Sequence, residues 1–128
     1  INLFDCTLSR DNGALCVSHP NFKLCLPPEM AARVEAHARG EQVVLGVRPE
    51  YIDMSLIEHP GSIPAQIYVI EPQSDELLVD LMIGETLVRL RANREDLTFE
   101  PELDQRVYLT FLKELVHVFD RGTGLRVS

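Results

Sequence analysis

The sequence predicts a mostly β fold, a small β-barrel or sandwich with one substantial α-helix. Apolar and polar residues alternate in many short segments, which is the pattern of half-buried strands. Turn-forming residues separate these segments, and one segment has helical spacing instead. The 128 residues, 45% hydrophobic and 25% charged, suffice for one globular domain spanning residues 1–128.

Three short strands are expected first, at Phe4–Ser9, Ala14–Ser18 and Phe22–Leu26. The connections Asp11–Gly13 and His19–Asn21 consist of residues that favour tight turns. The three strands can then form a meander.

The segment Pro28–Arg39 predicts the single helix. Its apolar residues recur at four-residue spacing, at Met30, Val34 and Ala38. Pro28 suits the first helical turn, and Gly40 suits the position just past the end. Glu29 and Arg33 are spaced to form an ion pair on the helix surface.

Four further segments alternate with a period of two. They are Ile63–Val69, Leu77–Ile83, Val88–Ala92 and Val107–Phe111. Val43–Val47 is a continuous apolar stretch and predicts a buried strand. The turn Gly84-Glu85 predicts a hairpin between Leu77–Ile83 and Val88–Ala92, and Pro72–Asp75 predicts another turn. Many short strands around a single helix are typical of OB-like barrels.

Charge divides the chain unevenly. The net charge is −8, of which residues 1–50 carry −1 and residues 51–128 carry −7. The chain can divide after the buried-looking strand Val43–Val47, so we expect sub-units 1–47 and 48–128, the second of them acidic. An acidic surface repels phosphate backbones, and 6% aromatic residues with no tryptophan leave few stacking platforms, so nucleic acid is not expected as a partner. The acidic run 95–104 is interpreted as a solvated turn and not as a calcium site, because it lacks a glycine.

Cys6, Cys16 and Cys25 are odd in number and have no C-x-x-C spacing. This argues against a disulfide framework and against a standard zinc site. If the first strands form a meander, the thiols could approach one another and bind a soft metal. Buried thiols in a reducing compartment are the preferred interpretation.

No catalytic motif is present. The chain lacks a phosphate-binding loop, a G-x-S-x-G elbow and an H-x-x-x-H pair, so no catalytic, cofactor-binding or metal-binding residue is assigned. His117 lies in an apolar segment and is interpreted as a structural histidine.

Without a membrane-spanning stretch or a secretory signal pattern, we expect the protein in the cytoplasm. The chain starts at Ile1 and not at methionine, which fits a processed chain or a piece of a longer sequence.

Two strings stand out, residues 46–52 (GVRPEYI) and residues 117–126 (HVFDRGTGLR). Their turn chemistry predicts structural roles. Arg48 can pair with Glu50 or a neighbouring carboxylate while Pro49 fixes a sharp exit from the preceding strand. Asp120 can accept backbone hydrogen bonds across a turn in which Gly122 or Gly124 has a positive φ, and a final strand at 125–127 would then fold back.

The first string resembles G-[IV]-R-P-E-x-[IL], and the second resembles H-[LIV]-F-D-x-x-T-G-x-x. Both occur in the C-terminal regulatory (TOBE, OB-like) domain of ATP-binding subunits from ABC importers for sugars, glycerol phosphate and related solutes. Ile1–Phe4, Ile63–Glu71 and Glu76–Val79 also resemble segments of that domain, whereas Pro72–Asp75 departs from the usual L-G-S. The structural or regulatory positions carried over are Gly46, Arg48, Pro49, Glu50, His117, Phe119, Asp120, Thr123 and Gly124.

The resemblance implies a non-catalytic regulatory and dimerisation domain. ATP and magnesium would bind to an ATPase domain outside this chain. The implied partners are a second copy, the ATPase domain of the same subunit, the transporter's membrane subunits and possibly a regulatory protein, at the cytoplasmic side of the inner membrane. Two alternatives remain open, a free-standing binder of a small ligand or oxyanion and, less favoured, an OB-type nucleic-acid binder.

Overall fold

The computed structural model describes residues 1–128 and confirms the mostly β fold class. It contains two five-stranded sheets, one α-helix and three short 3₁₀ helices. The strands are β1 (Asn2–Asp11), β2 (Ala14–His19), β3 (Phe22–Cys25), β4 (Gln42–Val47), β5 (Ile52–Ser55), β6 (Ile63–Gln73), β7 (Glu76–Ile83), β8 (Thr86–Asn93), β9 (Arg106–Phe111) and β10 (His117–Asp120). The helices are α1 (Pro28–His37), η1 (Pro49–Tyr51), η2 (Arg94–Asp96) and η3 (Lys113–Leu115).

The chain folds into two compact units. The helical unit comprises residues 3–47 and 112–128, and the acidic unit comprises residues 1–2 and 48–111. The acidic unit holds thirteen acidic and five basic residues, a net charge of −8, whereas the helical unit holds seven of each. The predicted boundary after residue 47 coincides with this division. The predicted sub-unit 48–128 is too long, because residues 112–128 pack with the first segment.

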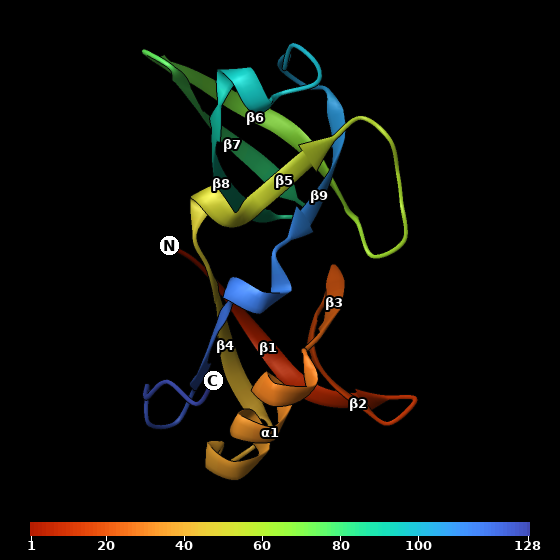
Figure 1. Ribbon diagram of the computed structural model, residues 1–128, viewed down its shortest axis with the longest axis vertical. Coiled ribbons are helices and arrows are strands. Elements are labelled where there is room, and N and C mark those ends of the chain that lie inside the picture. Colours follow the sequence, from red (N-terminus) through yellow and green to blue (C-terminus); the bar gives the residue numbers. More distant parts are fainter. The chain divides into compact units, whose positions relative to one another are not determined.

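The helical unit is built on the sheet β10-β4-β1-β2-β3 (Figure 1). The turn between β1 and β2 consists of Asn12 and Gly13, whose φ values of 51° and 85° are the left-handed conformations that tight hairpins need. Pairing of β2 with β3 places Cys16 directly opposite Cys25. The predicted meander of three strands is therefore present.

Helix α1 packs its buried residues, Met30 and Val34, against the helical unit. It ends at His37, two residues earlier than predicted, and Ala38 caps it with an extended backbone. Gly40 does not have a positive φ, so it does not serve as the expected C-terminal cap. The expected Glu29 ion pair with Arg33 is also absent, and Glu35 on the same helix pairs with Arg10 instead.

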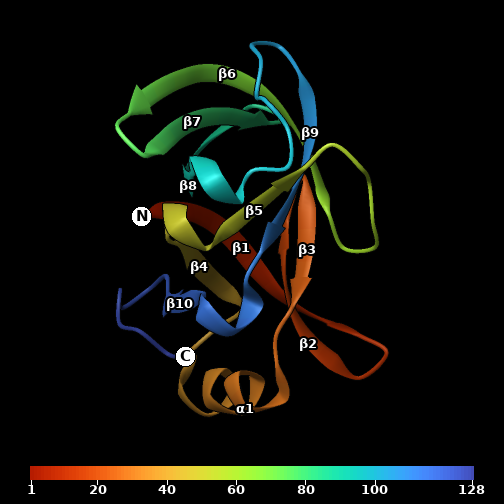
Figure 2. The same cartoon turned by 45° about the horizontal axis from the view of Figure 1, so that its top comes forward.

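The acidic unit is built on the sheet β5-β9-β6-β7-β8. Figure 2 shows β6 and β7 curving side by side, and Figure 1 shows β8 beside β7. The Gly84-Glu85 turn that closes the β7–β8 hairpin is confirmed, with φ of 57° at Gly84. The pairing of β6 with β7 shifts by one residue between Ile67 and Val69, as in a β-bulge.

Strand β5 was not predicted, because only Ile52 and Met54 supply an apolar alternation in it. The expected final strand at 125–127 is reduced to an isolated bridge between Phe119 and Arg126. No helix of the structure is long and apolar enough to cross a membrane.

Each unit has a core of alternating inward side chains. In the acidic unit these are Ile52, Ile63, Ala65, Ile67, Leu77, Val79, Leu81, Ile83, Val88, Leu90, Val107, Leu109 and Phe111. In the helical unit they are Phe4, Cys6, Leu15, Cys16, Val17, Leu26, Met30, Val34, Val43, Leu45, Val47, Val116, Val118 and Val127. Both cores consist mainly of branched aliphatic residues, as strands with one buried face require.

Candidate functional site

The first string begins at the end of β4 and continues into η1. Gly46 is buried in β4 and pairs with His117 of β10 in the antiparallel register. Arg48 precedes η1, its carbonyl accepts a hydrogen bond from the Tyr51 N–H at 3.0 Å, and Pro49 occupies the first helical position. Arg48 and Glu50 are both exposed, and Arg48 forms no ion pair with Glu50 or with a neighbouring carboxylate.

The closing string forms a turn around Asp120, whose side chain is buried with 3% exposure. Its Oδ1 accepts the Arg39 N–H and its Oδ2 accepts the Thr123 N–H, both at 3.0 Å. The Gly124 N–H donates to the Asp120 carbonyl at 2.8 Å, with φ of 75° at Gly124. The backbone hydrogen bond and the positive φ predicted for this turn are thus present.

These backbone donors also set the acidity of Asp120. The hydrogen bond from Arg39, followed by that from Thr123, lowers the pKa of the Asp120 carboxyl below its ordinary value. The carboxylate is consequently ionised, and each of its oxygens accepts a backbone hydrogen bond. Such a group fixes the segment after α1 to the closing turn, and it is unavailable for acid or base chemistry.

Arg121 is a structural residue that the sequence did not single out. Its guanidinium donates to the carbonyls of Cys6 at 2.9 Å and Val43 at 3.1 Å, and to the Gln42 Oε1 at 2.8 Å. These acceptors lie on β4, which is the neighbour of β10 in the sheet, and on β1, which is the next strand beyond β4. One side chain therefore ties three strands together across 78 to 115 residues of sequence.

The other positions of the closing string support the same turn. The His117 ring is half-buried, 6.3 Å from the Phe119 ring between centroids. The Thr123 hydroxyl accepts the Leu125 N–H at 3.2 Å. None of these residues lies with a nucleophile or a general base in an arrangement for catalysis.

Cys16 and Cys25 form a disulfide, so the expectation that the thiols remain reduced and unpaired is wrong for these two. Cys6 is a free, buried thiol. Burial raises the pKa of the Cys6 thiol to about 11, which keeps it protonated and unreactive at neutral pH. No group of three His, Cys, Asp or Glu side chains is placed to hold a metal ion.

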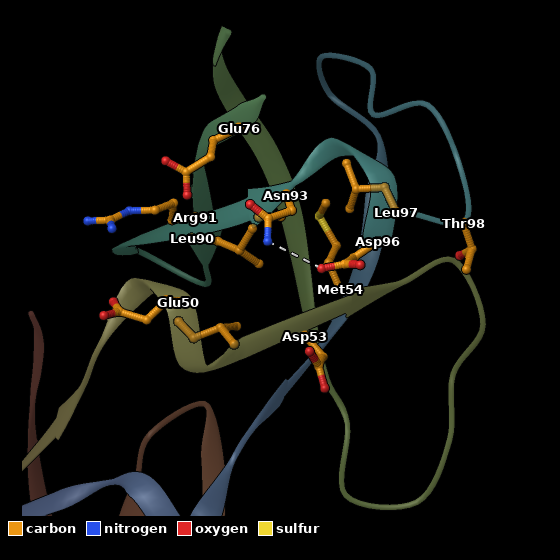
Figure 3. A pocket seen from close by; sticks show the side chains of 12 residues that line it. Glu50, Asp53, Met54, Glu76, Leu90, Arg91, Asn93, Asp96, Leu97 and Thr98 are labelled. Carbon is orange, nitrogen blue, oxygen red and sulfur yellow. Dashed lines mark hydrogen bonds between the residues drawn. The ribbon is translucent and has the colours of Figure 1, made fainter. Parts of the chain in front are cut away.

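A cavity of about 280 Å³ in the acidic unit is the candidate binding site. Figure 3 shows it between β8 with η2 on one side and η1 with β5 on the other. We call it the edge pocket, because β5 and β8 are the two outer strands of their sheet. Its lining residues are Glu50, Ile52, Asp53, Met54, Glu76, Leu90, Arg91, Ala92, Asn93, Asp96, Leu97 and Thr98.

The edge pocket combines an apolar base with an acidic rim. Met54, Ala92 and Leu97 supply partly exposed apolar surface, while the rim has four carboxylates against the single guanidinium of Arg91. Asn93 Nδ2 donates to Asp96 Oδ2 at 3.4 Å, the dashed line in Figure 3. Of the positions carried over from the two strings, Glu50 alone lines the pocket. Such a site suits a cationic or hydrogen-bond-donating ligand and repels anions.

The fold and the family comparisons agree on the class of domain. Residues 1–52 match the family of the MalK OB fold domain. In three dimensions the chain is similar to the cytoplasmic molybdate-binding protein ModG, crystallised with molybdate bound, with a TM-score of 0.67 over 91% of this chain and 94% of that one. The identity of 15% limits that likeness to the fold. The chain therefore has an OB-type β fold, and its first 52 residues are similar to the OB fold domain of MalK.

Its relatives are ATP-binding subunits. The chain is 33% identical over 129 residues to the sn-glycerol-3-phosphate import ATP-binding protein UgpC 2 of Agrobacterium fabrum. It is 26% identical over 131 residues to an uncharacterised ABC transporter ATP-binding protein, y4oS, of Sinorhizobium fredii. The alignments cover this whole chain and 31% of each relative. The resemblance inferred from the two strings is confirmed.

Proposed function

We propose that this chain is a regulatory and dimerisation domain, without catalytic activity of its own, of an ATP-binding subunit that drives import of a sugar or related solute. The observation that carries the proposal is the alignment of the whole chain with a third of two ATP-binding subunits. The geometry is compatible with it, since the residues of the two strings support turns and strand ends rather than a reaction centre.

The proposed partners follow from that assignment. ATP and magnesium bind to an ATPase domain of the same subunit, and the membrane subunits of the transporter contact that subunit at the cytoplasmic side of the inner membrane. A regulatory protein that contacts this domain would bias the opening and closing of the paired ATPase domains, because it binds one state better than the other.

A surface for self-association is available on the acidic unit. Tyr68 on β6 and Leu87 on β8 are 63% and 55% exposed, and Val69 beside the bulge is 42% exposed. Large apolar side chains exposed on one sheet, here on the two strands that flank β7, favour contact with another protein surface. We propose that two copies of the domain meet through this surface.

Light scattering over a concentration series tests this part of the proposal. The wild-type chain is expected to dimerise, and Leu87→Asp is expected to shift it toward monomer. Leu103→Asp, an exposed leucine outside the strands, is the matched control. A wild-type chain that stays monomeric at the highest concentration contradicts the self-association.

The catalytic part is tested separately with the full-length ATP-binding subunit. We expect ATP hydrolysis from the full subunit and none from residues 1–128. Hydrolysis by the isolated chain would contradict a non-catalytic role.

The likeness to ModG favours a second candidate, a binder of a small oxyanion. A thermal-shift screen with molybdate, tungstate and sugars tests it, since a specific ligand raises the unfolding temperature. The net charge of −8 on the acidic unit opposes anion binding there. Salt-sensitive retention of single-stranded DNA would favour the remaining alternative, a nucleic-acid binder.

A further inference from the structure

Strand β8 has an unpaired edge, and one side chain already occupies part of it. As the last strand of its sheet, β8 pairs only with β7. The carboxamide of Asn2 donates to the Arg89 carbonyl and accepts the Arg89 N–H, both at 2.8 Å. The Asn2 carboxamide therefore makes the two hydrogen bonds that the N–H and the carbonyl of one residue on a neighbouring antiparallel strand would make.

The same edge continues into the edge pocket. In an antiparallel pair, backbone groups of alternate residues point toward the partner strand and away from it. Since Arg89 directs its N–H and carbonyl to the free edge, Arg91 and Asn93 do the same. Both residues line the pocket. The pocket therefore exposes backbone donors and acceptors in the positions where a further strand would pair.

The negative charge around this edge favours a positively charged binding partner. Glu50, Asp53, Glu76 and Asp96 line the pocket, and the unit that holds it has a net charge of −8. Between the carboxylates, Met54 and Leu97 offer partly exposed apolar surface. Side chains of an added strand would alternate between two faces, so an occupant with alternating apolar and basic residues satisfies both features.

We propose that the β8 edge beyond Asn2 binds an extended segment of a partner protein, with lysine or arginine alternating with apolar residues, as an added strand. The backbone of the segment pairs with Arg91 and Asn93, and its basic side chains face the carboxylates of the edge pocket. This interaction is independent of ATP hydrolysis and of self-association through Tyr68 and Leu87, so it can fail or succeed without them.

Fluorescence anisotropy with a labelled six-residue peptide of alternating valine and lysine tests the proposal on the chain of residues 1–128. We expect saturable binding that weakens with added salt. A peptide N-methylated at alternate backbone nitrogens keeps its charge but loses the pairing donors, and it is expected to bind at least about tenfold more weakly. Equal affinity of the two peptides would overturn strand addition.

Paired variants distinguish binding by the pocket carboxylates from general attraction of a basic peptide to the acidic unit. Glu50→Gln with Asp96→Asn is expected to weaken binding about tenfold, since both carboxylates line the pocket. Glu58→Gln with Glu100→Gln changes the charge of the same unit by the same amount at exposed positions outside the pocket. An equal loss in both pairs would contradict a specific site.

Amide exchange measured by NMR locates the contact. Bound peptide is expected to slow exchange at Arg91 and Asn93 and to leave Arg89, already paired with Asn2, nearly unchanged. Slowing at another strand would overturn the assignment to this edge. The alternative occupant of the β8 edge is a second copy of the chain. It would be shown by a dimer in which the Arg91 and Asn93 amides are protected without peptide and which dissociates when the peptide is added.

Discussion

Each unit is built on a five-stranded sheet, but the two units differ in net charge and in crosslinks. The helical unit is electrically neutral and is crosslinked by the Asp120 turn, the Arg121 hydrogen bonds and the Cys16–Cys25 disulfide. The acidic unit has a net charge of −8, and its one ion pair joins Arg89 to Asp80 on neighbouring strands. Its stability therefore depends chiefly on apolar packing. The comparison suggests that structural and binding roles are divided between the units.

Core truncation is expected to have the largest effect and tests whether the units unfold together. Leu45 and Leu81 are fully buried, one in each unit. Leu45→Ala and Leu81→Ala should each lower the free energy of unfolding by about 2 to 5 kcal/mol. Hydrogen exchange, followed unit by unit with denaturant, measures the result. If Leu81→Ala destabilises only the acidic unit, the units are independent; a common shift shows one cooperative transition.

Loss of the disulfide should affect the helical unit next most strongly. Cys16→Ser with Cys25→Ser removes a crosslink between residues nine apart, which is expected to cost about 2 to 3 kcal/mol. Urea denaturation of the oxidised protein and of this variant gives the difference.

Thiol counting provides the control for that variant. The native oxidised wild type should label at no cysteine near pH 8, because Cys6 is buried and its pKa is raised to about 11. It should label at one cysteine when denatured and at three when also reduced. Two reactive thiols in the native protein would contradict the disulfide.

Arg121→Ala should cost about 2 kcal/mol, since it leaves the carbonyls of Cys6 and Val43 without this donor. Arg126→Ala is the matched control, because the Arg126 side chain is exposed and donates a single long hydrogen bond, to Ser128 Oγ at 3.4 Å. Thermal unfolding should distinguish the two variants by several degrees. Equal melting temperatures would show that the Arg121 hydrogen bonds are replaced by water at no cost.

The smallest effect is a pH dependence confined to the helical unit. His19 stacks on Phe22 at 4.7 Å and meets Phe4 edge to face, and burial lowers the pKa of its imidazole below 6.5. The unfolded chain therefore binds a proton first, so stability falls as the pH drops below about 6.5 toward the folded pKa. His19→Phe should remove this slope, measured by unfolding at a series of pH values. An unchanged slope would assign it to another group.

Asp120 also makes the protein less stable as the pH falls, but at a lower pH than His19. Its folded pKa lies below 3.8, so its stabilising contribution is present at neutral pH and is lost as the pH falls through the folded pKa. The two groups thus predict separate acid-sensitive steps, and both belong to the neutral unit.

Features set by local chemistry could be predicted from the sequence. The period-two segments and the turns at Asn12-Gly13 and Gly84-Glu85 gave the strands and hairpins, because the alternation and the left-handed φ values are properties of a few consecutive residues. The hydrogen bond from the Thr123 N–H to Asp120 followed for the same reason, whereas the one from the Arg39 N–H joins residues 81 apart and did not.

Features that depend on strand order and register could not. The Cys16–Cys25 pair follows from the alignment of β2 with β3, and Arg121 reaches acceptors that neighbour it only in the sheet. The edge pocket collects residues from β5, β7, β8 and η2, so no single segment indicates it. The return of residues 112–128 to the first segment likewise depends on the tertiary fold.

The division of the chain also separates its charge from its crosslinks along the sequence. Residues 48–111 lie in the sequence between the two segments that make up the helical unit. Substitutions within residues 48–111 change the charge of the acidic unit and leave every donor and acceptor of the Asp120 and Arg121 hydrogen bonds in place. The proposed binding preference can therefore be redesigned within one continuous block of sequence.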